Sequence, residues 1–83
     1  MKSFRLEIVT PNGKIFEKWV TKVFLRTRSG DMIVMKGHIP LVAIIRPCEC
    51  RVDFEDGKNE KIILSGGILS VFKDGTKIIT NEL

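Results

Sequence analysis

The sequence has little of what catalytic and cofactor sites require. Its 83 residues include one histidine, two cysteines and no tyrosine. His38 has no partner serine or cysteine in a nucleophile elbow, because "SGGIL" at Ser65 lacks the G-x-S-x-G form. Neither "SGG" nor "DG" has the spacing and lysine of a phosphate-binding loop, and the acidic residues lie singly among basic ones. The sequence therefore predicts no catalytic residue, no cofactor and no metal site.

Long apolar runs and long runs of one charge are also missing. The run "IPLVAII" is far shorter than the roughly 20 residues of a membrane helix, and charge interrupts the N-terminal apolar residues too early for a signal peptide. The formal net charge is +4, from 14 Lys plus Arg against 10 Asp plus Glu. These basic residues are scattered along the chain, unlike the basic arms that bind nucleic acid, so no nucleic-acid partner is expected.

The two cysteines, Cys48 and Cys50, are separated by one residue. On a strand they would point to the same face with Cα atoms roughly 6.5 to 7 Å apart, which is at or beyond the limit for a disulfide. A structural metal site would need two more ligands than they provide. We expect two reduced cysteines that serve as small apolar side chains.

The chain consists of short β-prone segments separated by turn signals. Phe4, Leu6 and Ile8 alternate with polar residues, and "PNG", "RSGD", "EDGKN", "SGG" and "KDG" follow at intervals of about ten residues. Residues 14–27 are too long for one strand, and a bend is predicted near Lys18. No sustained helical period is present. The sequence predicts an all-β sandwich or barrel that forms a single domain over residues 1–83.

One segment does not alternate. Residues 41–45, "LVAII", are apolar at every position, whereas a strand with one solvated face should alternate. Either both faces are covered within the fold or another protein covers one of them, and the second reading is favoured for so small a sandwich. Phe24, between Lys22 and Arg26, suggests the same exposed patch.

A carrier domain is the alternative that the residues leave open. "VMKG" at residues 34–37 is predicted to lie in a hairpin, where biotinyl and lipoyl domains present a modified lysine. Lys36 would be the attachment site. It has Met35 before it, as in the biotinyl signature, but Gly37 instead of methionine after it.

Four blocks in order, residues 6–16, 23–30, 37–47 and 65–71, carry a resemblance to a known family. With "GDMIVMKGHIPLVAIIRP" followed by "LSGGILSV", the chain resembles the N-terminal β-sandwich domain of the epsilon subunit of F-type rotary ATP synthases. The resemblance implies a flattened sandwich of about ten short, mostly antiparallel strands. It also implies a non-catalytic subunit of the central stalk, which couples ion translocation to ATP synthesis.

The resemblance implies two partners, gamma and the c-subunit ring, and a peripheral position on the cytoplasmic face of the bacterial inner membrane or its organelle equivalent. The loop from Ser29 to His38 is expected at the ring. The implied ring contacts are Ser29, Gly30, Asp31 and His38, and the implied gamma contacts are Thr10, His38, Leu41, Val42 and Ile44.

The chain departs from the family at several positions. The family commonly has glycine in place of Ile33, proline in place of Lys36 and glycine in place of Cys48. Most members continue into a pair of C-terminal helices, whereas this sequence stops at "ITNEL". We therefore expect that helical hairpin to be absent here.

Overall fold

A computed structural model describes residues 2–81, which form nine strands and no helix. The all-β prediction is confirmed. Since this range consists of strands and connecting segments, it contains no candidate membrane-spanning helix. The strands are β1 (Phe4–Thr10), β2 (Gly13–Val20), β3 (Lys22–Thr27), β4 (Gly30–Val34), β5 (Leu41–Ile45), β6 (Cys48–Asp53), β7 (Asn59–Leu64), β8 (Gly67–Phe72) and β9 (Gly75–Ile79).

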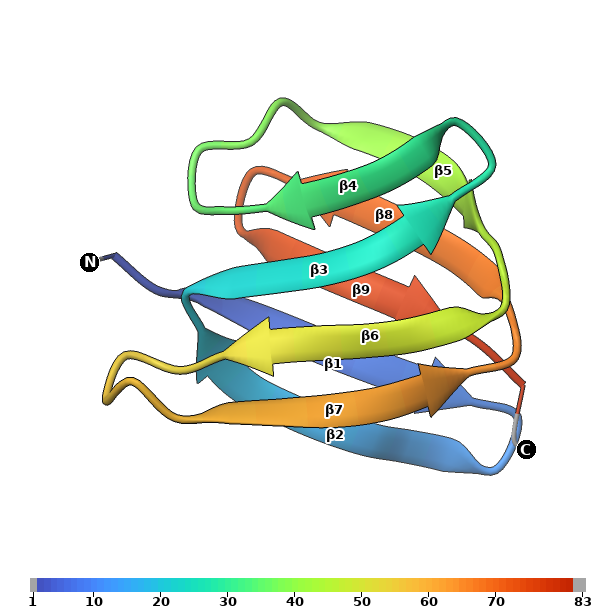
Figure 1. The fold of residues 1–83 in the computed structure, drawn as a ribbon, viewed down its shortest axis with the longest axis horizontal. Helices are drawn as coiled ribbons and strands as arrows, with labels where there is room; N and C mark the ends of the chain where they lie inside the picture. The colour runs from blue at the N-terminus through green and yellow to red at the C-terminus, as the bar shows by residue number, and fades with distance from the viewer. Residues whose placement is uncertain (1, 82–83) are drawn as a thin grey trace.

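The strands form two layers (Figure 1). The back layer has the order β2-β1-β9-β8-β5, and the front layer contains β4, β3, β6 and β7. One register pair, Thr27 with Ile45, joins β3 to β5 and makes the two layers one curled sheet. The β1–β9 pair is parallel, and the other pairs are antiparallel, as expected for mostly antiparallel strands.

The core lies between the layers and contains alternate residues of the strands. Leu6 and Ile8 of β1 and Ile78 of β9 are fully buried on the back layer, opposite Val23 and Val52 of the front layer. Burying side chains of this size contributes about 1.5 to 3 kcal/mol each. The period-two pattern in the sequence thus identifies the inward faces of both layers.

The bend predicted near Lys18 is wrong by a few residues. Strand β2 continues to Val20, and the chain changes layer at Thr21. The amide and hydroxyl of Thr21 both donate to the carbonyl oxygen of Asp53, at 2.7 and 3.1 Å. This double hydrogen bond joins the β2–β3 connection to the end of β6, and its partner is too distant in sequence to be found from a local pattern.

The glycines of "SGG" have the positive φ values that the sequence predicts, but the motif is not a tight turn, because it joins β7 of the front layer to β8 of the back layer, which do not pair with each other. Gly66 and Gly67 have φ values of 113° and 141°, which residues with side chains rarely adopt. A Cβ on Gly67 would lie 2.0 Å from the carbonyl oxygen of Ile79. Glycine is therefore required where β8 begins beside the end of β9.

Both cysteines are free and act as small apolar side chains, as predicted. Cys50 is fully buried in the core, and Cys48 is half-buried against it. Burial, with a smaller effect of Cys48, raises the pKa of the Cys50 thiol to about 12. Cys50 therefore remains protonated and unreactive at neutral pH.

Candidate interaction surface

A row of apolar side chains crosses the outer face of the back layer. Ile44 of β5 is in register with Ile68 of β8, Ile68 with Ile79 of β9, and Ile79 with Val9 of β1. The three isoleucines are 44 to 48% exposed, and Val9 is half-buried. With strands about 4.8 Å apart, this apolar row (Val9, Ile44, Ile68 and Ile79) extends about 14 Å across the sheet.

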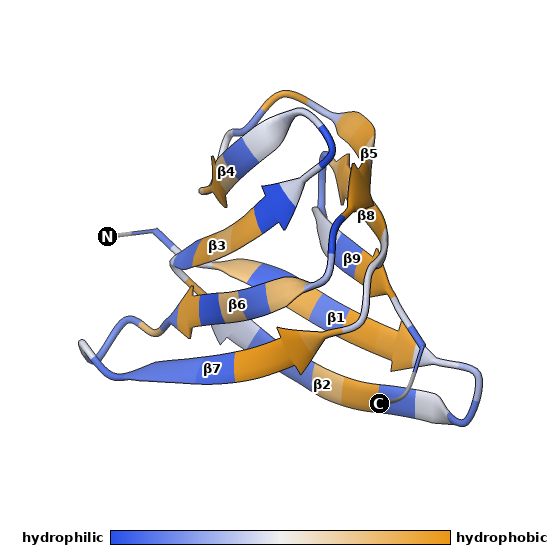
Figure 2. Cartoon of the chain, turned by 45° about the vertical axis from the view of Figure 1, so that its right-hand side comes forward, coloured by the Kyte–Doolittle hydropathy of each residue, from blue (hydrophilic) through white to orange (hydrophobic). Residues whose placement is uncertain are grey.

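Strand β5 explains why "LVAII" does not alternate. Ile45 is buried, and Leu41 and Ala43 pack against the core, while Val42 is 74% exposed beside Ile44. The whole of β5 is therefore coloured hydrophobic, whereas β6 alternates (Figure 2). One face of the strand is uncovered by the fold, as favoured from the sequence. Leu41, however, faces inward, away from the surface that Val42 and Ile44 share.

Phe24 does not belong to this patch, contrary to the prediction. It lies in β3 of the front layer and is half-buried. The guanidinium of Arg51 lies over its ring, 3.9 Å from the centroid. A cation–π contact of this kind covers the ring with a charged group, which the strand pattern alone does not reveal.

A network of charged residues borders the apolar row on β1 and β2. Glu17 forms ion pairs with Arg5 and with Lys14, the latter at 2.7 Å, and Lys14 also lies 3.5 Å from Glu7. Hydrogen bonds from Lys14 and Arg5 lower the pKa of Glu17. Lys14 is in register with Val9, so a neutralised basic residue ends the row on this side.

Two turns at one end of the sandwich share the pattern Thr-x-x-Gly. In "TPNG" the hydroxyl of Thr10 donates to the carbonyl of Gly13 at 3.0 Å, and in "TRSG" that of Thr27 donates to Gly30 at 2.9 Å. The residue before each glycine donates its amide back to the threonine oxygen. The repeat is visible in the sequence but was missed there.

Thr10 consequently does not present its side chain as the predicted gamma contact requires. Only 5% of the residue is exposed, and its hydroxyl closes the β1–β2 turn. The buried side chain of Thr10 therefore stabilises the conformation of that turn.

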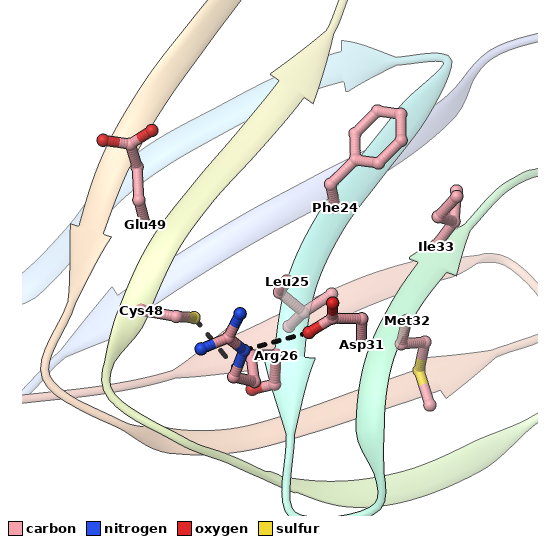
Figure 3. Close-up of a pocket in the computed structure, with 8 residues that line it drawn as sticks. All are labelled: Phe24, Leu25, Arg26, Asp31, Met32, Ile33, Cys48 and Glu49. Carbon is pink, nitrogen blue, oxygen red and sulfur yellow. Dashed lines mark hydrogen bonds and ion pairs between the residues drawn. The ribbon is translucent and has the colours of Figure 1, made fainter.

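Asp31 follows the second of these turns, at the start of β4. Its carboxylate accepts a hydrogen bond from Nε of Arg26 at 2.9 Å, and its side chain is 78% exposed (Figure 3). Hydrogen bonding and charge attraction from Asp31 raise the pKa of Arg26. Asp31 and its neighbours Ser29 and Gly30 therefore form an open, polar end of the sandwich.

The predicted loop from Ser29 to His38 is not one loop. Residues 30–34 form β4, a strand about 17 Å long by strand geometry, so Ser29 precedes one end of that strand and His38 follows the other. His38 closes a turn by donating its amide to Met35 at 3.1 Å. Its Nδ1–H donates to the carbonyl of Ile39 at 2.8 Å. Gly37, with φ of 88°, permits this turn.

The hairpin required for a carrier lysine is also not formed. Lys36 lies between β4, which pairs with β3, and β5, which pairs with β8. The two strands that flank Lys36 belong to different layers and do not pair with each other. Within residues 2–81, no three His, Cys, Asp or Glu side chains gather as a metal site would require.

Comparison with known proteins assigns the family. The model of the family "ATP synthase, Delta/Epsilon chain, beta-sandwich domain" matches residues 3–83. This chain belongs to that family. The match covers nearly the whole chain, and the carrier alternative for Lys36 is therefore dropped.

Two curated relatives show the same relationship. The chain is 40% identical over 80 residues to an ATP synthase epsilon chain of Staphylococcus haemolyticus, covering 95% of this chain and 59% of the relative. It is 38% identical over 82 residues to the sodium-ion-specific epsilon chain of Propionigenium modestum, covering 99% and 59%. The chain thus spans about three fifths of the length of these relatives.

Solved structures show the same fold. A chain in the cryo-EM structure of Euglena gracilis mitochondrial ATP synthase, OSCP/F1/c-ring, superposes with a TM-score of 0.87 and 28% identity over 94% of this chain and 50% of that one. A chain from the central stalk/c-ring of the Tetrahymena thermophila enzyme has a TM-score of 0.80 at 10% identity, over 98% and 65%. The second likeness supports the fold alone.

Proposed function

We propose that this chain is a non-catalytic central-stalk subunit of a rotary ATP synthase, linking gamma to the c-subunit ring. In that position it is peripheral to the membrane, on the cytoplasmic side in a bacterium, and helps couple ion translocation to ATP synthesis. Family membership and the epsilon-chain names of its relatives support this role. The observation that carries it is the exposed, in-register apolar row, because contiguous apolar patches mark interaction sites.

The outer face of the back layer and the two ends of β4 suggest which part of the surface contacts gamma and which part contacts the ring. Val42, Ile44 and the apolar row are assigned to gamma, since they offer an apolar area without a cover in residues 2–81. Ser29, Gly30 and Asp31 are assigned to the polar loops of the ring. His38 lies at the other end of β4, so we assign it to gamma alone.

Capture from the source cell tests the function directly. The tagged chain is expressed in its own organism, and proteins that remain bound after mild detergent extraction of membranes are identified by mass spectrometry. Gamma and the c subunit are expected. Recovery of neither, with the tagged chain folded, would contradict the proposal.

The ring contact has its own test. Asp31→Lys should loosen the coupling of the ring to the stalk, because it places a cation where an exposed carboxylate now stands beside Arg26. The measurement is ion-driven ATP synthesis in membrane vesicles that carry the variant. Wild-type rates of synthesis would remove Asp31 from the ring contact.

A further inference from the structure

Three arginines meet at the corner where β3 and β5 join the two layers. The amide of Arg28 donates to the carbonyl of Ile44 at 2.9 Å, and the amide of Arg46 donates to the carbonyl of Arg26 at 2.9 Å. These bonds lie on either side of the single register pair between the strands. The corner thus brings together residues that are up to 20 positions apart in the sequence.

The side chains at this corner alternate between core and solvent. Thr27 and Ile45, the register pair itself, are 1% and 2% exposed. The flanking residues Arg26, Arg28 and Arg46 are all exposed. Side chains alternate in direction along a strand, so the three guanidinium groups belong to the outer surface.

The positive charge at the corner is only partly neutralised. Arg26 pairs with Asp31 at 2.9 Å, whereas neither Arg28 nor Arg46 forms an ion pair with any residue that the structure describes. Continuing the β3–β5 register by one step places Arg26 opposite Arg46. Like charges directly opposite each other destabilise a sheet. The charge of Arg46 therefore does not stabilise the pairing of β5 with β3.

The arginines also continue the apolar row. Arg28 is beside Ile44 on the neighbouring strand, as Lys14 is beside Val9 at the other end. The row is thus bounded by a basic residue on each side. Lys14 is neutralised by Glu17 and Glu7, whereas Arg28 has no acidic partner in the described chain.

We propose that Arg28 and Arg46 bind carboxylate side chains of the protein that covers the apolar row. This inference rests on the proposed function and specifies the chemistry of the stalk partner at that corner. The planar guanidinium fork binds carboxylates with two parallel hydrogen bonds. Such a pair at the margin of an apolar contact is partly shielded from water, so it contributes more than an exposed ion pair.

A protein partner fits this corner better than a lipid surface. The β3–β4 turn that projects here consists of Arg28 and Ser29, with no apolar side chain to insert into a bilayer. The adjoining isoleucines lie flat on a sheet and are half-exposed, as for a surface that packs against another folded chain.

The first test measures binding to a rotor subcomplex of gamma and the c ring, purified from the source organism and freed of this chain. The double variant Arg28→Glu/Arg46→Glu should bind at least about thirtyfold more weakly than wild type, since both carboxylate pairs become repulsive. Lys58→Glu, in the turn between β6 and β7 at the other end of the front layer, is the matched control. It should bind like wild type.

Thermal unfolding separates a lost contact from a damaged fold. Arg46→Glu replaces a like-charge pair with an opposite-charge pair beside Arg26. The isolated variant should therefore unfold at the same temperature as wild type or higher, while its affinity for the rotor falls. Equal losses of stability and affinity would assign Arg46 a structural role and overturn the proposal.

Chemical coupling identifies the partner group. In Arg46→Lys, a carbodiimide would condense the lysine amine with a carboxylate in contact with it. An amide bond forms, and the carbodiimide takes up the released water and becomes a urea. Mass spectrometry should find residue 46 joined to an aspartate or glutamate of gamma, and a link to the c subunit would overturn the assignment of this corner to the protein that covers the apolar row. A variant that binds the rotor but forms no such link would count against the proposal.

The outcomes distinguish this inference from the function on which it rests. If wild type binds the rotor, Val42→Asp does not, and the double arginine variant binds normally, the corner proposal falls and the function stands. If wild type fails to bind the rotor, both fall. Arginine-dependent binding to vesicles of equal parts phosphatidylcholine and phosphatidylglycerol, with rotor binding unchanged in the double variant, would assign the corner to lipid instead.

Discussion

The outer faces of the two layers differ in how they arrange similar residues. On the front layer, Ile33 of β4 and Ile63 of β7 are 49% and 55% exposed, and two strands, β3 and β6, lie between them. On the back layer, isoleucines that are no more exposed lie in register on adjacent strands. Isolated exposed apolar residues are ordinary on protein surfaces, whereas contiguous ones mark an interaction site.

The front layer also covers its largest outward-facing apolar side chain. Arg51 lies over the ring of Phe24 and pairs with Asp53 at 3.1 Å, and Lys61 lies 3.8 Å from Glu49. On the back layer the corresponding charges gather on β1 and β2 and leave β5 and β8 uncovered. Register, more than composition, therefore separates the solvated face from the face that we propose as the docking surface.

Disrupting the close backbone contact between Gly67 and Ile79, under the apolar row, should lower the stability of the fold more than any other change proposed here. Gly67→Ala would place a Cβ 2.0 Å from the carbonyl oxygen of Ile79. We expect a loss of about 4 kcal/mol in the free energy of unfolding, from backbone strain and overlap together, measured by urea denaturation. Gly57→Ala is the control, because Gly57 also has a positive φ but has open space around it. Equal losses would show that the close approach to Ile79 is unimportant.

An aspartate substituted on each outer face tests whether the back layer binds gamma and the front layer does not. Val42→Asp should weaken binding to gamma by about 3 kcal/mol, since an unpaired carboxylate would be buried at the contact, with little change in unfolding. Ile63→Asp places the same charge at a similarly exposed isoleucine of the front layer and should leave affinity unchanged. The two affinities are measured by titration with purified gamma. Equal losses for both variants would refute the assignment of gamma to the back layer.

Removing the guanidinium that covers the ring of Phe24 should have a smaller effect, on the free energy of unfolding. Arg51→Ala removes the guanidinium over the ring and is expected to cost about 1 kcal/mol in the free energy of unfolding. Lys61→Ala, in register with Arg51 on β7, serves as the control and should cost less. If the two variants unfold alike in thermal melts, the cation–π contact contributes nothing measurable.

The charged network at the margin of the row should show the smallest effect, as a pH dependence. The pKa of Glu17 is lowered in the folded chain by hydrogen bonds from Lys14 and Arg5. Its contribution to stability is therefore present above the ordinary glutamate pKa near 4.5 and is lost as the pH falls through the lower folded value.

In Glu17→Gln, the melting temperature should accordingly fall slightly less between pH 5 and pH 3 than it does in wild type. Glu60→Gln, at an exposed position of β7 for which the described residues offer no ion pair, is the control. An unchanged pH profile in Glu17→Gln would show that solvent screens this network completely.

The sequence predicted correctly those features of the fold that depend only on residues close together in the chain. Alternation at Phe4, Leu6 and Ile8 identified the inward face of β1, and the glycine-containing turns separated the strands. The doubly apolar β5 was recognised from residues 41–45 alone. These features depend on side-chain direction and backbone conformation within a few residues.

The layer change at Thr21 was not predictable in the same way. Thr21 is held by Asp53, 32 residues later. The residues "MIVM" at 32–35 by themselves predict a strand, which β4 confirms within a few residues. The single loop from Ser29 to His38 was implied only by the resemblance to the family. Resemblance to a family supplied the candidate residues Thr10 and Leu41, but not the direction in which their side chains point.

By itself, the sequence determined an all-β chain with strands separated by glycine-containing segments, two free cysteines that act as small apolar side chains, and a strand apolar on both faces, because these follow from residue type and short-range spacing. Only the tertiary structure decided that Ile44, Ile68, Ile79 and Val9 form one row, and that Arg28 and Arg46 stand at its end. The physical reason is that strand register is set by hydrogen bonds between distant segments. A surface depends on which strands those bonds place side by side.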